Sequence, residues 1–357
     1  PVFVTSNLVK LLDVTPGNIT VHQLRGGGGF GRRLSNEYIY EAALISRRVG
    51  TPVKLQWKRE DDMAFDYFRA PTYYRLQGAI SSDGQLTGWK NLVASASADG
   101  KTANYGAGYR PYDFPGKVIA NVAIEQSFVK SQTPTGAWRA PISNVYAFAE
   151  QSFIAELAHT AGQDHRDFLL NAIGDKGWIK EGDMASLNTT RARATIEAVT
   201  KAAGWGRTLP EGHGLGLAFF LSHSGHIAEV TEVSVEGKRI TVHDVWVAAD
   251  VGQVVNLSGL ENQLQGSVID GLSSMAAQSI SIKKGAVVQS NYDSYPLLRM
   301  PQSPRVHVLA LNSGYRPTGA GEPALPPLAP AVCNAVFNAC GERIRALPIS
   351  KAGFTIV

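Results

Sequence analysis

The sequence predicts an α+β fold with mixed and antiparallel sheets and flanking helices, divided into two domains. Three observations lead to this fold class. The 36 glycines and 18 prolines in 357 residues indicate many turns and enough chain for two domains. The expected strands at 18–24 and 53–57 and those around Asp83-Gly84 alternate apolar and polar residues, whereas buried parallel strands are continuous apolar runs. Asp83-Gly84 stands between two such segments, which is a strong hairpin signal.

In chain order, the expected elements alternate between small groups of strands and amphipathic helices. Asn36 is a candidate cap for the first long helix, and Gly50 is a candidate stop. The segment 210–214 is a plausible linker, so we expect one domain over 1–209 and a second over 210–357. Strands are expected at 18–24, 53–57, 73–80, 86–97, 118–129, 214–221, 227–235 and 239–249, and helices at 37–49, 144–160, 167–173, 189–203, 260–277 and 329–346.

The composition is that of an ordinary globular protein and excludes several classes. Hydrophobic residues make up 44% and charged residues 18%, and the net charge of +4 comes from scattered Lys and Arg, so we expect no nucleic-acid surface. No apolar run reaches the ~18 residues of a membrane span. Cys333 and Cys340 are seven positions apart on an expected helix, ~10 Å along its axis, which is too far for a disulfide. We expect both to be buried, and two cysteines cannot hold a four-thiolate iron–sulfur cluster.

The run Gly26-Gly27-Gly28-Gly29-Phe30-Gly31-Arg32-Arg33 is the most informative segment. Glycines permit positive φ and close backbone approach to a ligand, and a strand–loop–helix setting with arginines favours a phosphate-bearing partner. Two alternatives stay open. Gly26, Gly28 and Gly31 match the dinucleotide fingerprint G-x-G-x-x-G, with acidic residues at 60–62 after the next expected strand. A plain surface loop is the other alternative.

Two constrained loops carry candidate functional side chains. Glu322 stands between Gly321 and Pro323, and a carboxylate held in a stiff loop before a helix suits a general base; a simple turn glutamate is the alternative. Trp138-Arg139 follows Gly136 in the second loop. Here the arginine would orient an anion or substrate, and the tryptophan would line a pocket together with the tyrosines of 105–112. The alternative is an arginine packed on an aromatic ring.

Two further segments are ambiguous. The turn 250–256 is followed by Gln263 and a helix rich in small residues from Gly266 onward, which suits a polar ligand or close helix packing. His223, His226 and Glu229 suggest a metal site, but the rings of His-x-x-His lie on opposite faces of a strand, so we do not favour one.

Together and in this order, these loops resemble the molybdenum-binding large subunit of the xanthine dehydrogenase/aldehyde oxidase family. The double arginine and the Gly-x-Trp-Arg loop indicate the isoquinoline 1-oxidoreductase β-subunit-like branch. The resemblance covers essentially the whole chain but only the C-terminal part of such a subunit, so we expect the chain to be part of something longer. The resemblance rests on 27–33, 136–139, 249–256, Gln263-x-x-Gly266 and 319–323.

The resemblance implies two elongated domains and molybdopterin cytosine dinucleotide carrying molybdenum, held through the pterin with no protein metal ligand. It implies that Glu322 is the catalytic base and that Trp138 lines the substrate pocket. The positions implied to contact the cofactor are Gly27, Gly28, Gly29, Phe30, Gly31, Arg32, Arg139, Gln263 and Gly321.

The implied activity is oxidation of an aldehyde to a carboxylic acid, or hydroxylation of an N-heteroaromatic ring with water as the oxygen source. Electrons would leave to an iron–sulfur small subunit, with cytochrome c as a further candidate partner, and the N-terminal part of the large subunit would complete the site. The resemblance also implies a periplasmic or membrane-associated location. Residues 140–141 and 222–226 depart from the branch's commonest residues, which implies an unusual substrate pocket. The alternatives are a nicotinamide-binding dehydrogenase domain and a non-catalytic assembly subunit.

Overall fold

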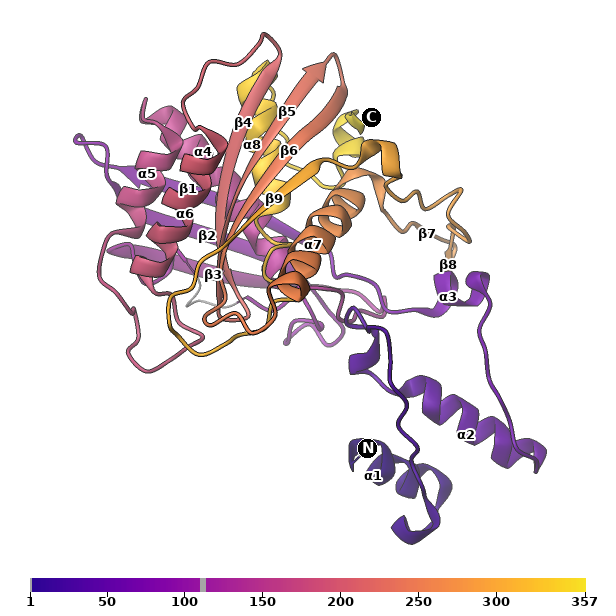
Figure 1. Ribbon diagram of the computed structural model, residues 1–357. Helices are drawn as coiled ribbons and strands as arrows, with labels where there is room; N and C mark the ends of the chain where they lie inside the picture. Colours follow the sequence, from indigo (N-terminus) through magenta and orange to yellow (C-terminus); the bar gives the residue numbers. More distant parts are fainter. Residues whose placement is uncertain (1, 110–113) are drawn as a thin grey trace.

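The structure is a computed structural model that describes residues 2–109 and 114–357 (Figure 1). It confirms the α+β class, with helices on either side of mixed and antiparallel sheets. The helices are α1 (Val2–Leu12), α2 (Glu37–Val49), α3 (Arg59–Phe65), α4 (Ser143–Thr160), α5 (His165–Ile173), α6 (Thr189–Ala203), α7 (Leu257–Ala277) and α8 (Leu328–Cys340). The strands are β1 (Thr72–Ile80), β2 (Leu86–Ser97), β3 (Asn121–Lys130), β4 (His213–Ser222), β5 (Gly225–Glu236), β6 (Arg239–Asp250), β7 (Ile282–Lys283), β8 (Ala286–Val287), β9 (Arg305–Ala310) and β10 (Thr355–Ile356).

The first sheet has the order β1-β2-β3. β1 and β2 form the predicted antiparallel hairpin, and its turn contains Gly84 at φ +81°, a conformation that glycine adopts without steric cost. β3 pairs with β2 in parallel, with Gly88 opposite Asn121. The parallel pairing requires a long crossover between β2 and β3, and this crossover contains residues 110–113, which lie outside the described part of the chain.

The second sheet is built on the antiparallel strands β4, β5 and β6. Two short strands from the C-terminal part pair in parallel with β6: β9 along Asp244–Ala249 and β10 at Arg239 and Ile240. The sequence predicted the three long strands but neither short one, because six and two residues carry too little periodicity to identify.

Helices cover both faces of the second sheet and define two hydrophobic clusters. On one face, α7 and α8 pack against β5 and β6, and a Cβ at Gly216 of β4 would overlap backbone atoms of α8, so glycine permits the close approach. On the other face, α6 packs on β5 and β6, α4 packs on β4 and on β1 of the first sheet, and α5 packs against α4 and α6, with Ile196 and Phe219 in one cluster. This cluster unites residues from both sides of position 210, and the domain division there stays a prediction.

The N-terminal region extends away from the sheets (Figure 1). α2 buries none of its residues, and Phe3, Leu24, Leu34 and Phe65 are largely solvent-exposed. The segments 18–24 and 53–57 were predicted as strands, and this prediction is wrong: they form no ladder, since neither has a neighbouring strand with which to pair. Asn36 precedes α2 without a side-chain cap, whereas Gly50 ends it in the left-handed conformation as expected.

The last long helix is shorter than predicted. α8 ends at Cys340 because Gly341 adopts φ +78° and closes it, so 341–346 lie outside the helix. Cys333 is buried as expected, and burial raises the pKa of its thiol to about 12. Cys340 is exposed, which corrects the prediction that both thiols are buried. Among residues 2–109 and 114–357, none of the helices has the length and apolar character that a bilayer crossing needs.

Candidate functional site

Arg139 joins three segments that are far apart in the sequence. It precedes α4 and its side chain is only 6% exposed. Its backbone N–H donates to the carbonyl of Phe30 (3.0 Å), its Nε donates to the carbonyl of Gly321 (2.7 Å), and its Nη2 donates to the carbonyl of Gln263 (3.0 Å). The glycine-rich loop, α7 and the Glu322 loop therefore meet around this one residue.

Acidic and basic side chains surround this junction. Nη1 of Arg139 lies 3.5 Å from Oδ2 of Asp270 on α7. Burial raises the pKa of Asp270, and Arg139 offsets this only in part. Arg69 donates to the carbonyl of Trp138 (3.1 Å), and its guanidinium lies 4.3 Å from the centre of the Trp138 ring. Burial lowers the pKa of Arg69 to about 9. The arginine that packs on Trp138 is therefore Arg69, which the sequence reasoning did not single out.

The glycine-rich loop packs tightly at one end and is open at the other. Gly28, Phe30 and Gly31 have φ of 141°, 48° and 98°. A Cβ at Gly31 would overlap the carbonyl of Ala137, so only glycine fits against the Trp138 loop. A Cβ at Gly27 would meet nothing within 4 Å, and Phe30 is 59% exposed. The open end therefore presents main-chain atoms to solvent beside Arg139.

The arginines after this loop already have partners within the chain. Arg32 forms ion pairs with Glu37 and with Asp66, where Nε and Oδ1 are 2.6 Å apart. The guanidinium of Arg33 lies 4.8 Å from the centre of the Tyr38 ring. Asp61, one of the three acidic residues at 60–62 that the dinucleotide-fingerprint alternative offers as a ribose ligand, accepts a hydrogen bond from the Lys58 N–H at the start of α3. Because no strand forms at 18–24 before the loop, the fold lacks the strand–loop–helix unit of that alternative.

Glu322 is held at both carboxylate oxygens. Oε1 accepts a hydrogen bond from the Ala140 N–H (3.2 Å), and Oε2 lies 3.2 Å from Nε2 of His223. The side chain of Glu322 is 40% exposed. Gly321 lies beside the exposed side chain of Gln263, since a Cβ there would be 3.3 Å from Oε1 of Gln263. The predicted base thus lies at the Arg139 junction.

The turn 250–256 is hydrogen-bonded to the segment that leads into the Glu322 loop. Thr318 N–H donates to the carbonyl of Val251, and Gln253 N–H donates to the carbonyl of Tyr315, both at 2.9 Å. Asp250 is buried and paired with Arg191, with Nη2 and Oδ1 2.7 Å apart. Burial acts to raise the pKa of Asp250, but hydrogen bonds from Arg191 and other donors together hold it below the usual value. Asp250 therefore anchors the turn.

The histidines that suggested a metal site separate in the fold. His226 is buried, its Nε2 accepts a hydrogen bond from the Asn188 N–H (3.0 Å), and burial lowers its pKa to about 3. Glu229 is fully buried and burial raises its pKa well above the usual value. Within the described ranges, no three His, Cys, Asp or Glu side chains gather as metal ligands. His223 instead contacts Glu322, a role that its sequence position did not signal.

The tyrosines expected in the substrate pocket differ in their environments. Tyr109 packs edge-on against Tyr146 and donates to Glu150, whereas Tyr105 is exposed. Tyr112 lies outside the described residues.

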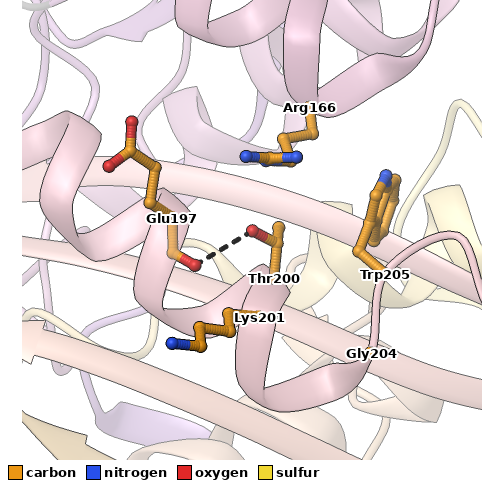
Figure 2. A pocket seen from close by; sticks show the side chains of 6 residues that line it. All are labelled: Arg166, Glu197, Thr200, Lys201, Gly204 and Trp205. Atoms are coloured by element: carbon orange, nitrogen blue, oxygen red, sulfur yellow. Dashed lines mark hydrogen bonds between the residues drawn. The ribbon is translucent and has the colours of Figure 1, made fainter.

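Two cavities lie outside this junction. Figure 2 shows the first, of about 420 Å³, where Arg166 of α5 faces the end of α6 and Trp205. The second, of about 580 Å³, adjoins Glu37, the ion-pair partner of Arg32, and includes Trp57 and Tyr67. Neither cavity includes Arg139, Gln263 or Glu322.

Two family models match the chain, and both describe a molybdopterin cofactor-binding domain. The first matches residues 1–171 and the second matches residues 149–304. Together they extend over most of the chain and include the glycine-rich loop, Arg139 and Gln263.

Known proteins resemble the chain along nearly its whole length. It is 30% identical to isoquinoline 1-oxidoreductase subunit beta of Brevundimonas diminuta, over 96% of this chain and 44% of that protein. It is 29% identical to membrane-bound aldehyde dehydrogenase [pyrroloquinoline-quinone] of Gluconacetobacter polyoxogenes, over 97% of this chain and 48% of that protein. The chain thus spans about half the length of these relatives.

The fold is also similar to that of a solved enzyme. Quinoline 2-oxidoreductase from Pseudomonas putida 86 superposes with a TM-score of 0.79 at 13% identity, over 98% of this chain and 70% of that one. At this identity the likeness concerns the fold alone. The matched models and the relatives agree: the chain belongs to the xanthine dehydrogenase/aldehyde oxidase family and corresponds to part of its molybdenum-binding large subunit.

Proposed function

We propose that the chain is part of a molybdenum hydroxylase that oxidises an aldehyde to a carboxylic acid or hydroxylates an N-heteroaromatic ring, with water as the source of oxygen. The observation that carries this proposal is the Glu322 carboxylate, held at both oxygens where the glycine-rich loop, α7 and Arg139 meet. The printed names of the two relatives, an isoquinoline oxidoreductase subunit and an aldehyde dehydrogenase, support the two substrate classes.

The residues present fit molybdopterin cytosine dinucleotide carrying molybdenum. The open end of the glycine-rich loop presents main-chain atoms of Gly27, Gly28 and Gly29 beside the exposed ring of Phe30, where a Cβ at Gly27 would meet no other group. Such a surface lets a cofactor lie directly against the backbone. We propose that these positions, Gly31 and the exposed amide of Gln263 hold it, with molybdenum bound through the pterin and by no protein side chain. When bound, this group supplies the two-electron oxidation of the substrate carbon.

The protein's own residues then have distinct tasks. Glu322 accepts the proton that is released as oxygen from water is added to the substrate, which requires a carboxylate fixed in orientation. Arg139 fixes the relative positions of Phe30, Gln263 and Gly321 through their carbonyls, and Gly321 carries Glu322. Trp138, with Arg69 packed on its ring, lines the substrate pocket. Arg32, which is paired with Glu37 and Asp66, contributes to cofactor binding by holding the loop in place.

The partners follow from the proposed chemistry. The electrons must leave the chain, whose two cysteines cannot hold a four-thiolate cluster. We propose that an iron–sulfur small subunit receives them, with cytochrome c as a further candidate, and that the remainder of the large subunit completes the site. The domain division near residue 210 and a periplasmic or membrane-associated location belong to the same proposal. One relative's name mentions pyrroloquinoline quinone, whereas both matched models describe a molybdopterin cofactor-binding domain. We therefore propose molybdopterin as the cofactor.

The test is metal and nucleotide analysis of the chain purified together with its native partner chains. We expect about one molybdenum per complex and release of CMP on acid treatment. We also expect Glu322→Gln to retain molybdenum and CMP but to lose turnover of small aldehydes and N-heteroaromatic compounds with a dye as electron acceptor. An assembled complex without molybdenum would overturn the proposal, and so would an active Glu322→Gln variant.

A further inference from the structure

We infer that His223 is a positioning residue for Glu322, held in place by Ser222. The inference rests on the proposed function, because it assigns His223 to the side chain that we propose as the base. Nε2 of His223 lies 3.2 Å from Oε2 of Glu322, and Nδ1 lies 2.8 Å from Oγ of Ser222. Serine, histidine and glutamate therefore form a continuous chain of polar contacts.

The Ser222 contact determines how the ring faces Glu322. A carboxylate only accepts hydrogen bonds, so the ring nitrogen that faces it must carry the proton. In the neutral ring only one nitrogen carries a proton, so when Nε2 is protonated, Nδ1 accepts a hydrogen bond from the Ser222 hydroxyl. The hydrogen bond at Nδ1 therefore fixes Nε2 as the nitrogen that carries the proton. Ser222 is only 2% exposed and lies at the end of β4, so its hydroxyl is a fixed anchor. The second ring nitrogen is thereby directed at Glu322.

The backbone at His223 adopts a conformation that its side chain does not favour. His223 and Ser224 join β4 to β5 as a two-residue turn, with φ of 50° and 65°. Turns of this kind favour Asn-Gly or Gly-Gly, because both positions require positive φ. A histidine at such a position is uncommon, which together with its contact to Glu322 points to a function for the side chain. The alternative, that the turn merely links two strands, does not account for its contact with the Glu322 loop.

The turn also packs directly against the loop that carries Glu322. A Cβ at Gly225 would lie 3.1 Å from Cβ of Pro323, so the residue after the turn contacts the residue after the base. The opposite oxygen of the carboxylate is held by the Ala140 N–H. With His223 on one side and Ala140 on the other, the carboxylate has one preferred orientation. Without the His223 contact, the carboxylate keeps the hydrogen bond from the Ala140 N–H, about which it can rotate.

The experiment compares His223→Leu and His223→Gln in the enzyme assembled with its partner chains. We expect His223→Leu to lower kcat about 10- to 100-fold, the range seen when a group that orients a functional ligand is removed, with KM changed less than threefold. His223→Gln retains an N–H donor and should recover most of the loss. His243→Leu is the matched control, because His243 also contacts a serine, Ser234, but no carboxylate of the site. It should keep the wild-type kcat.

A second readout does not depend on turnover. We expect a water-soluble carbodiimide to label Glu322 several-fold faster in His223→Leu than in the wild type, as followed by peptide mass spectrometry, because Oε2 loses its partner. Wild-type kcat in His223→Leu, an equal loss in His223→Gln, or an unchanged labelling rate would overturn the inference. Failure of the proposed function gives a different result, an active Glu322→Gln variant, and the labelling rate then decides on the His223 contact alone.

Discussion

Gly31 lies directly against the carbonyl group of Ala137, so that a Cβ at Gly31 would overlap it and would stand 2.9 Å from the Trp138 nitrogen. This contact locks the glycine-rich loop to the segment that carries Trp138 and Arg139. Because Gly31 also has φ +98°, both the space and the backbone conformation require glycine.

Gly31→Ala should therefore separate the two loops. We expect the assembled enzyme to contain less than one tenth of the wild-type molybdenum, with a lower melting temperature, measured by elemental analysis and calorimetry. Gly17→Ala is the control, since a Cβ at Gly17 meets nothing within 4 Å and its φ is not positive. Wild-type molybdenum content in Gly31→Ala would show that the loop contact does not matter for the cofactor.

Arg139→Met should destabilise the protein by about 3 kcal/mol, as expected when a buried charge loses its partner. The substitution leaves two carbonyls, those of Gly321 and Gln263, without their side-chain donor, and it removes the ion-pair partner of Asp270. The measurement is urea denaturation followed by tryptophan fluorescence. Arg305→Met removes an exposed arginine from Asp244 and should cost less than about 1 kcal/mol. Equal effects of the two substitutions would contradict the role of Arg139 as the junction of the site.

Acid should destabilise the fold through His226. Its folded-state pKa of about 3 lies below the ordinary value of 6.5, so between these values the unfolded state binds a proton that the native state does not. Stability from this group is present above pH 6.5 and is lost as pH falls toward 3, by at most about 1.4 kcal/mol per pH unit. His226→Gln should remove this slope from the unfolding free energy between pH 4 and 6. An identical slope in the variant would contradict the assignment of this pH dependence to His226.

The two thiols should differ sharply in reactivity. Cys340 is exposed, whereas Cys333 is buried with a raised pKa, and only the thiolate reacts. In the folded chain at pH 8, iodoacetamide should modify Cys340 within minutes and leave Cys333 unmodified until urea is added. Peptide mass spectrometry distinguishes the two sites. Modification of Cys333 at a comparable rate would mean that α8 opens far more readily than its packing implies.

Short-range signals in the sequence correctly predicted several turns, helix ends and long strands. The hairpin at Asp83-Gly84, the helix stop at Gly50 and the long strands β4, β5 and β6 are all present. The predicted strands at 18–24 and 53–57 are absent, because a strand needs a neighbour and alternation alone does not supply one.

Part of the candidate site could also be predicted from the sequence. The sequence points to Phe30, Arg139 and Glu322 because of their constrained loops and to Gln263 because its amide precedes the small residues of a helix, and the fold brings these four residues together. The contact of His223 with Glu322 was not predictable, because it depends on how the β4–β5 turn packs on a distant loop. Arg69 lies outside every motif and was missed for the same reason.

The hydrogen bond from Arg139 to Gly321 joins residues 182 positions apart. During synthesis, Arg139 leaves the ribosome long before its acceptor exists, and a contact of this span forms late because the intervening chain must first be ordered. The junction is therefore incomplete until Gly321 has been synthesised. If the cofactor is bound where we propose, it can enter a complete site only after the segments of Arg139 and Gly321 have folded together, so insertion of the cofactor follows the folding of this region.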